Sequence, residues 1–404
     1  MTTVPTVSLG SITEIRSGIG FPVELQGKVR GKYPFAKVGD ISRTARSGSA
    51  WIYSAANYVD DADLSMLRAK IVPRGAVVFA KIGEAIQQNL RVLTASEFLV
   101  DNNVFAVIPQ PSVDEKYLYH FLRSIDLYPM ASSTTVPSIR KTELAKLPVP
   151  LPSHSEQQRI AEVLDRVDAL REKRRQAIAL LDDLAQSIFL DMFGDPRLNP
   201  SGWQEALLSD VVSEFRYGTS NKSEGMGFPA LRIPNVVGGA LNLTELKNVP
   251  VTDKELERLR LQEGDLLFVR TNGNPDYVGR CAIFSQSVVE KSGLDSRNVI
   301  YASYLIRARL NIKEADPIFL REFLTSSFGR AKLRENGKTS AGQYNINIDG
   351  LGKVPIFLPP VSRQQEFAAR LTALDSRRRT QRCHLAELDA LFASLQSRAF
   401  RGEL

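Results

Sequence analysis

The sequence predicts an α+β protein in which two domains of mixed helices and strands alternate with two long helices. Three observations support this prediction. A proline-rich segment followed by a long segment of periodic apolar residues occurs twice, 207 residues apart. The apolar residues after the prolines recur at helical spacing. The rest of the chain consists of short β-branched and aromatic runs separated by glycine and proline, which is typical of mixed domains.

The repeat is clearest where the prolines lie. Leu147–Pro152 (LPVPLP) resembles Val354–Pro359 (VPIFLP), and Ser155–Gln158 (SEQQ) resembles Ser362–Gln365 (SRQQ) in the same register. The register continues without a gap to the pair Phe193 and Phe400, which indicates a true duplication.

Upstream of the prolines the likeness persists with a shifted register. Pro73–Phe79 resembles Gln262–Phe268, and Phe35–Asp40 resembles Ala230–Asn235. The chain is therefore divided into a first domain (1–152), a central connector helix (153–195), a second domain (196–359) and a distal connector helix (360–404).

Both connectors are predicted to be long helices. Ser155-x-x-Gln158 and Ser362-x-x-Gln365 have the spacing of a capping box, so each helix is expected to begin there. Apolar residues follow at steps of three and four, and Arg174 alone breaks this seam in the first helix. The pattern predicts an antiparallel coiled coil that relates the two halves by a pseudo-twofold repeat.

The middle of each connector is basic, with Arg171 to Arg175 in the first and Arg377 to Arg382 in the second. Three interpretations remain open at this point. The basic side chains line DNA, pair with acidic residues of the helices, or form a solvated face.

Within the domains, short segments show strand or helix character. Strands are predicted at Val77–Phe79, Val104–Ile108, Leu266–Val269 and Val299–Leu305. Short helices are predicted at Tyr117–Ser124 and Phe319–Ser326.

Composition excludes several classes of protein. Hydrophobic residues make up 43% and charged residues 24% of the chain, which excludes intrinsic disorder as the main description. Two distant cysteines do not form a disulfide framework, and we expect a cytoplasmic protein without signal peptide or membrane span. The net charge of +7 permits a polyanionic partner.

No set of residues indicates catalysis. Asn274-Pro-Asp-Tyr277 resembles the loop of amino-methyltransferases, but no glycine-rich cofactor loop precedes it. Gly18–Pro22 and Gly225–Pro229 look alike and are interpreted as loops. Asp60, Asp61 and Asp63 are interpreted as a solvated loop and not a metal site. We therefore expect no enzyme activity, no metal and no cofactor in this chain.

Polar and basic residues gather instead in loops at matched places of the two domains. Arginine can read guanine, asparagine and glutamine can read adenine, and lysine or serine can hold phosphates. The predicted DNA-binding residues are Lys37, Arg43, Lys81, Gln87, Gln88, Asn89, Arg91, Ser138, Arg140, Lys141, Arg232, Asn235, Arg270, Asn272, Asn274, Tyr277, Arg280, Gln343, Tyr344, Asn345 and Asn347.

The order of these motifs resembles a known family. The proline-rich segment, Ser155-Glu-Gln-Gln-Arg-Ile160, a long helix and Phe193-Gly-Asp-Pro196 resemble the central region of type I restriction–modification specificity subunits. The C-terminal helix ending in Phe400-Arg-Gly-Glu-Leu404 resembles their distal region.

The resemblance implies two target-recognition domains, each reading one half of an asymmetric double-stranded DNA site, and a non-catalytic subunit. It further implies two methyltransferase partner subunits carrying S-adenosylmethionine, and restriction subunits using ATP and Mg²⁺. Pro137–Lys141 and Gln343–Asn347 match a loop region near the DNA in that family.

Two alternatives stay open beside this reading. A coiled-coil adaptor would bind proteins through its domains. A self-contained methyltransferase or nuclease would require the Asn274–Tyr277 loop to be catalytic.

Overall fold

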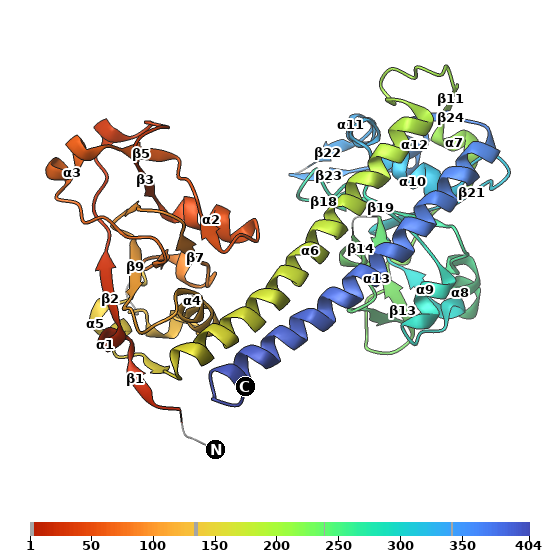
Figure 1. Ribbon diagram of the computed structural model, residues 1–404. Helices are drawn as coiled ribbons and strands as arrows, with labels where there is room; N and C mark the ends of the chain where they lie inside the picture. The colour runs from red at the N-terminus through yellow and green to blue at the C-terminus, as the bar shows by residue number, and fades with distance from the viewer. Residues whose placement is uncertain (1–3, 133–135, 238, 341) are drawn as a thin grey trace. The chain divides into compact units, whose positions relative to one another are not determined.

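The computed structural model describes residues 4–132, 136–237, 239–340 and 342–404 (Figure 1). The chain forms two compact units. Unit 1 comprises residues 1–177 and 381–404, and unit 2 comprises residues 178–380. Each unit therefore holds one mixed domain together with one half of each long helix.

Unit 1 contains two sheets and a strand pair. The larger sheet has the order β2-β9-β6-β7-β4, and the smaller has the order β5-β3-β8, in which β3 and β8 run parallel. β1 pairs with β10. The strands are β1 Thr6–Ser8, β2 Thr13–Ser17, β3 Tyr33–Ala36, β4 Trp51–Ile52, β5 Asn57–Val59, β6 Val77–Ala80, β7 Arg91–Thr94, β8 Leu99–Val100, β9 Val104–Pro109 and β10 Pro148–Pro150. The helices are α1 Leu9–Ile12, α2 Val38–Arg46, α3 Asp61–Leu67, α4 Glu115–Ser124 and α5 Lys141–Ala145.

Unit 2 repeats this plan with additions. Its main sheets have the orders β12-β21-β17-β19 and β16-β13-β20, and β11 pairs with β24. A third sheet, β18-β23-β22, and the pair β14-β15 complete it. The strands are β11 Gln204–Leu207, β12 Val212–Tyr217, β13 Phe228–Leu231, β14 Val236–Val237, β15 Ala240–Leu241, β16 Lys247–Val249, β17 Leu266–Val269, β18 Thr271–Asn272, β19 Cys281–Ile283, β20 Ile300–Tyr301, β21 Leu305–Leu310, β22 Lys338–Ser340, β23 Gln343–Asn345 and β24 Pro355–Leu358. The helices are α7 Leu208–Val211, α8 Asp253–Leu259, α9 Gln286–Lys291, α10 Pro317–Thr325, α11 Ser327–Glu335 and α12 Ile348–Gly352.

The shifted register upstream of the prolines is confirmed. Ala36 pairs in parallel with Val100, and Leu231 pairs in parallel with Tyr301. Four residues after each of these strand ends, an acidic or amide side chain folds back. Asp40 accepts a hydrogen bond from the main-chain N of Lys37 at 2.9 Å, and Asn235 accepts one from that of Arg232 at 2.8 Å.

Two details of the prediction were wrong. The run Val299–Leu305 is not one strand, because it is divided between β20 and β21. The interpretation of Gly225–Pro229 as a loop was wrong at its end, because Phe228 and Pro229 begin β13, and the likeness of Gly18–Pro22 to this segment is accidental. The true counterpart of Gly18 is Gly218: a Cβ atom on either would lie about 2 Å from the carbonyl oxygens of the strand end it crosses, so only glycine fits there.

The long helices are α6, His154–Phe193, and α13, Val361–Ala399. In unit 1 the first half of α6 packs on the last half of α13, through Ile160, Leu164 and Val167 against Phe392 and Ala399. In unit 2 the last half of α6 packs on the first half of α13, where Phe189 and Phe193 meet Phe367. The pairing is therefore antiparallel, as predicted.

The predicted start of each helix was slightly wrong. α6 begins at His154, and the capping hydroxyl is that of Ser153, which accepts from the main-chain N of Glu156 at 3.3 Å. α13 begins at Val361, directly after Pro360. Ser155 and Ser362 therefore lie inside the first turn of their helices and do not cap them.

The basic middle of the helices forms repeated ion pairs. In unit 1, Arg171 lies 2.6 Å from Asp168 and 2.6 Å from Asp389. In unit 2, Arg378 lies 3.1 Å from Asp375 and 2.9 Å from Asp182. These four contacts are equivalent under the 207-residue repeat.

Arg174, which interrupts the apolar seam, donates to Gln381, its own repeat counterpart, at 2.7 Å. Of the three interpretations of the basic clusters, pairing with acidic residues of the helices therefore holds for Arg171 and Arg378, whereas the partner of Arg174 is an amide. Each of them keeps its charge beside a partner on the facing helix.

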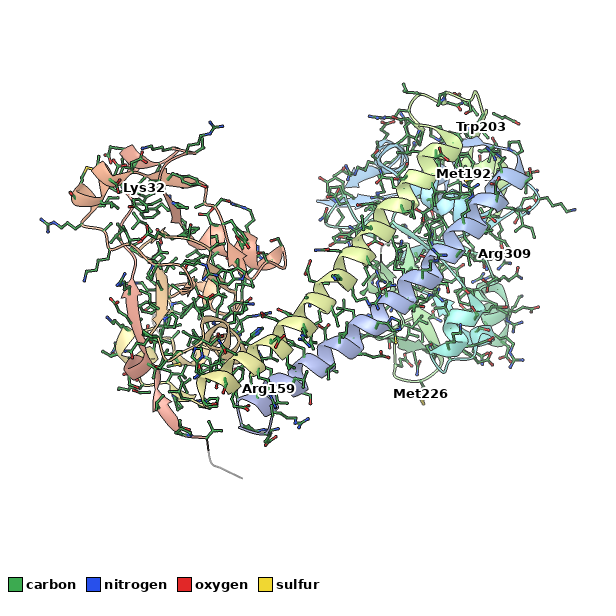
Figure 2. All side chains as sticks on the ribbon, viewed as in Figure 1. Lys32, Arg159, Met192, Trp203, Met226 and Arg309 are labelled. Atoms are coloured by element: carbon green, nitrogen blue, oxygen red, sulfur yellow. The ribbon has the colours of Figure 1, made fainter. Side chains whose placement is uncertain are left out.

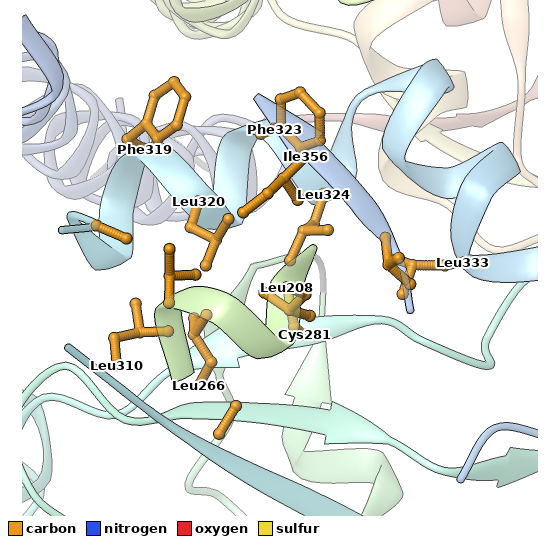
Figure 3. Packing of buried hydrophobic residues seen from close by; sticks show 14 of the residues in the cluster. Leu208, Leu266, Cys281, Leu310, Phe319, Leu320, Phe323, Leu324, Leu333 and Ile356 are labelled. Carbon is orange, nitrogen blue, oxygen red and sulfur yellow. The ribbon is translucent and has the colours of Figure 1, made fainter. Parts of the chain in front are cut away.

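The core of unit 2 lies between its main sheet and helices α7 and α10. Figure 3 shows Phe319, Leu320, Phe323 and Leu324 of α10 near Leu208, Leu266 and Leu310. All of these side chains are buried, and the same cluster extends to the end of α6, where Met192 and Trp203 are labelled in Figure 2. The domain thus packs directly on the long helices.

Candidate nucleic-acid interface

In unit 1, Lys81 directly follows the central strand β6. Its main-chain N donates to Asn103 O at 2.9 Å, and its carbonyl accepts from Ile139 N at 2.9 Å. Gly83 N donates to Pro137 O at 2.8 Å, and Ile82 forms a bridge with Ser138. The structure therefore brings the predicted residues Lys81 and Ser138 together.

The ammonium group of Lys81 lies 5.2 Å from the centre of the Phe105 ring. Burial lowers the pKa of Lys81, and the charge of Asp101 partly opposes this. Among the described residues, no carboxylate lies within 4.0 Å of its ammonium group, so the charge remains available to an anion.

In unit 2, Arg270 takes the place of Lys81. It follows the central strand β17, its main-chain N donates to Tyr304 O at 2.9 Å, and its carbonyl accepts from Ile346 N at 2.8 Å. Ile139 and Ile346 are equivalent under the 207-residue repeat. Both units thus hold one cation against the same crossing segment.

The crossing segment of unit 2 is a short sheet. Thr271 pairs with Asn345 and Asn272 with Tyr344, so residues from two distant predicted loops share one surface. Gln343, Tyr344 and Asn347 are exposed there. Asn347 also has a structural task, because its side chain accepts from Gly350 N at 2.8 Å and caps α12.

A second arginine of this unit stacks on an aromatic ring. The guanidinium carbon of Arg280 lies 3.8 Å from the centre of the Tyr277 ring, and its Nε donates to Asp276 O at 2.9 Å. Asn272 and Asn274 each accept from a main-chain N two residues later, which shapes the loop between them and Tyr277. This loop is a turn rich in polar groups.

Two predicted residues are too buried to reach DNA. Arg91 is 3% exposed and donates to Asn89 O and Ile125 O, each at 3.0 Å. Asn235 is 1% exposed and donates to Asn242 O and Glu245 O. Both join loops inside the domain, so their role is structural.

The remaining predicted residues lie at the surface with varied partners. Gln88 accepts from Arg46, Asn89 donates to Arg123 O, and Arg43 lies 3.2 Å from Asp40. Lys37 donates to Gln26 and Arg232 to Glu245 O. Gln87, Arg140 and Lys141 are exposed, and their side chains form no hydrogen bond or ion pair within the described ranges.

Sequence reasoning predicted Tyr277 but missed the aromatic side chains beside Arg270. The Tyr217 ring lies under the guanidinium of Arg270, and Tyr304, 55% exposed, follows β20 next to it. An aromatic residue at the end of the strand before a glycine, as in Tyr217-Gly218, was the available signal.

No group of three or more His, Cys, Asp or Glu residues that could hold a metal occurs within the described ranges. Asp60 and Asp61 form ion pairs with Lys28 and Lys32 instead. No helix in the described part of the chain has the length and apolar character needed to cross a bilayer.

Comparison with known proteins agrees with this arrangement. Residues 1–180 match the family model of the type I restriction modification DNA specificity domain. The EcoKI specificity subunit of Escherichia coli (strain K12) is 28% identical, over 73% of this chain and 67% of the relative. The EcoBI specificity subunit of Escherichia coli is 21% identical over 98% of this chain and 85% of the relative.

Two solved structures share the fold along nearly the whole chain. The S subunit from M. genitalium aligns with a TM-score of 0.60 at 16% identity, covering 98% of this chain and 96% of that one. A chain from a study of type I R-M complex assembly aligns with a TM-score of 0.55 at 19% identity, covering 99% and 98%. Residues 1–180 are thus similar to the type I restriction modification DNA specificity domain, and the chain shares the fold of the S subunit structure along nearly its whole length.

Proposed function

We propose that this chain reads a two-part asymmetric DNA sequence, one part with each unit, and has no catalytic activity of its own. The observation that carries the proposal is the pair of matched surfaces. In each unit a cation that has no carboxylate partner among the described residues follows the central strand and meets the segment before α5 or α12. Because the two units share the backbone arrangement but carry different side chains there, each would read a different DNA half-site.

The long helices would bind two methyltransferase subunits. Leu184 and Leu391 are equivalent under the repeat, and both are exposed, by 43% and 47%. Two matched apolar positions, one in each unit, support two equivalent docking surfaces for two copies of one partner. S-adenosylmethionine would belong to those partners, and ATP and Mg²⁺ to restriction subunits that join them.

The test is selection from a pool of random duplexes by the chain purified with the methyltransferase subunit of its own host. We expect two short fixed sequences separated by a gap of constant length. A single continuous motif, or no preference at all, would contradict the proposal.

Salt dependence separates DNA reading from a protein adaptor. Contacts with phosphates make the logarithm of affinity fall linearly with the logarithm of salt concentration. Duplex binding that does not respond to salt would favour the adaptor.

A further inference from the structure

The residue that follows the central strand is Lys81 in unit 1 and Arg270 in unit 2. The main chain of Arg270 is held on both sides, by Tyr304 O and by Ile346 N. Its Cα position is therefore fixed relative to the exposed β18-β23-β22 sheet. A side chain on such an anchored backbone has little freedom to lose when it binds.

The guanidinium of Arg270 is oriented but not neutralised. Its carbon atom lies 4.8 Å from the centre of the Tyr217 ring, and Nη1 lies 3.5 Å from Ser303 O, at the limit of a hydrogen bond. No carboxylate within the described ranges forms an ion pair with it.

Three other arginines of the β12-β21-β17-β19 sheet already pair with carboxylates. Arg216 and Arg307 pair with Glu214, and Arg309, labelled in Figure 2, lies 2.8 Å from Asp265. These pairs hold the sheet together. Arg270 differs from these arginines because the fold holds it in place but no described carboxylate forms an ion pair with it.

Tyr217 connects Arg270 with the segment that crosses it. The Tyr217 hydroxyl accepts a hydrogen bond from Ile348 N, the first residue of α12, at 3.1 Å. The same ring supports the guanidinium face, which leaves the edge of the guanidinium for other partners. Tyr217 therefore links the guanidinium of Arg270 to the start of α12, directly after Asn345–Asn347.

We propose that Arg270 is a specificity-determining residue of unit 2 that reads a guanine, and that Tyr217 is its positioning residue. This inference rests on the proposed function. A planar guanidinium stacked on one face donates two parallel hydrogen bonds from its edge, which matches the O6 and N7 acceptors of guanine in the major groove.

The counterpart in unit 1 explains how the two half-sites differ at this position. Lys81 lies over Phe105, which comes from β9 and not from the strand that carries Tyr217 in unit 2. An ammonium group is a point charge without a fixed plane. Unit 1 therefore lacks the two-donor edge at the equivalent place.

The test compares the sequences selected by the methyltransferase complex carrying R270A, R270K, Y217A or Y217F. In the wild type we expect one G·C pair to be required in the half-site of unit 2. R270A and R270K should lose discrimination at that base pair by about 10-fold or more, and the other half-site should stay unchanged. Y217A should weaken the same discrimination less, and Y217F, which keeps the ring, should retain most of it.

The matched control is R297A, which removes the same charge from unit 2 at a side chain that is 76% exposed and, among the described residues, forms an ion pair only with nearby Asp295. R297A should leave all base preferences unchanged. R270K keeps the charge and decides the matter if R270A does not fold.

Several outcomes would overturn the inference. They are a unit 2 half-site without a required G·C pair, unchanged preference in R270K, or equal loss in both half-sites. These outcomes differ from failure of the proposed function, in which the wild type itself would select no two-part sequence.

Discussion

The two units attach their domains to the long helices at equivalent places with different chemistry. In unit 1, α4 contacts α6 through charged groups. Lys116 and His120 each lie 2.7 Å from Asp165, and Arg123 lies 2.6 Å from Asp168. His120 is fully buried in this contact. Charge complementarity therefore helps to hold this domain against its helix, beside an apolar cluster that includes Tyr117, Ile160 and Leu164.

In unit 2 the equivalent helix, α10, makes an aromatic contact. Phe319 lies between Phe189, Phe193 and Phe367, with ring centres 4.9 to 6.4 Å apart. All four rings are buried, so this contact depends on packed volume and not on charge.

One feature is the same in both units. Gln157 accepts from Asp114 N at 2.9 Å and donates to Ser112 O and Pro152 O. Its repeat counterpart Gln364 accepts from Asp316 N at 2.9 Å and donates to Glu314 O and Pro359 O.

Both glutamines therefore join the start of the domain helix to the start of a long helix. The two units therefore share the hydrogen bonds from one glutamine to main-chain groups, while the side chains that pack the domain on the long helices differ.

The largest expected effect is at the aromatic contact. Phe319→Ala should lower the free energy of unfolding of unit 2 by about 3–5 kcal/mol, because it removes a buried ring and leaves a cavity. The chain has two tryptophans, Trp51 in unit 1 and Trp203 in unit 2, so W51F and W203F backgrounds report each unit separately. An equal loss in unit 1 would show that the contact is not local.

The glutamine contacts come next. Gln157→Ala and Gln364→Ala should each lower the free energy of unfolding of their unit by about 2–3 kcal/mol, since each leaves buried main-chain groups without partners. Denaturant unfolding in the two single-tryptophan backgrounds should give similar values for the two units. A cost in one unit alone would contradict the shared connection.

The charged contact of unit 1 should be weaker. Asp168→Ala leaves Arg123 and Arg171 without a common partner and should cost about 1–2 kcal/mol, because these side chains are only partly exposed. The matched control is Asp375→Ala, its repeat counterpart in unit 2, which contacts Arg378 alone and should cost less than about 1 kcal/mol. Equal losses of stability in the two variants would contradict the proposal that charged contacts matter more in unit 1 than in unit 2.

The smallest effect is the response to acid. Burial raises the pKa of Asp165, but hydrogen bonds from His120 and Lys116 outweigh this and lower it below the ordinary value of 3.8. A lowered carboxyl pKa gives stability that is present above the unfolded value and lost as the pH falls through the folded one.

Unfolding of unit 1, followed through Trp51 from about pH 5 downward, should therefore show a steeper loss in the wild type than in Asp165→Asn. Parallel curves for the two proteins would contradict this reading of the contact.

Much of this architecture could be predicted from the sequence. The repeat predicted two long antiparallel helices, and it placed polar loops at matched positions of the two domains, but it did not predict that Ile82 pairs with Ser138 or Thr271 with Asn345. Local periodicity and spacing carry this information, because they fix which residues share a face.

Burial of polar side chains could not be predicted in the same way. Arg91 and Asn235 look like their exposed neighbours in sequence, but their bonding partners, such as Ile125 O and Glu245 O, are brought close only by the folded chain. The Tyr217–Arg270 contact likewise joins β12 to the end of β17, which are far apart in sequence. Such contacts depend on tertiary geometry.

The central claim is that each unit reads its own half of one DNA sequence. The most direct measurement replaces residues 204–358, from the start of β11 to the end of β24, with the matching segment of a relative, and maps the sequences bound by the methyltransferase complex. The account predicts that one half-site changes while the other half-site is kept. A change in both half-sites, or in neither, would contradict it.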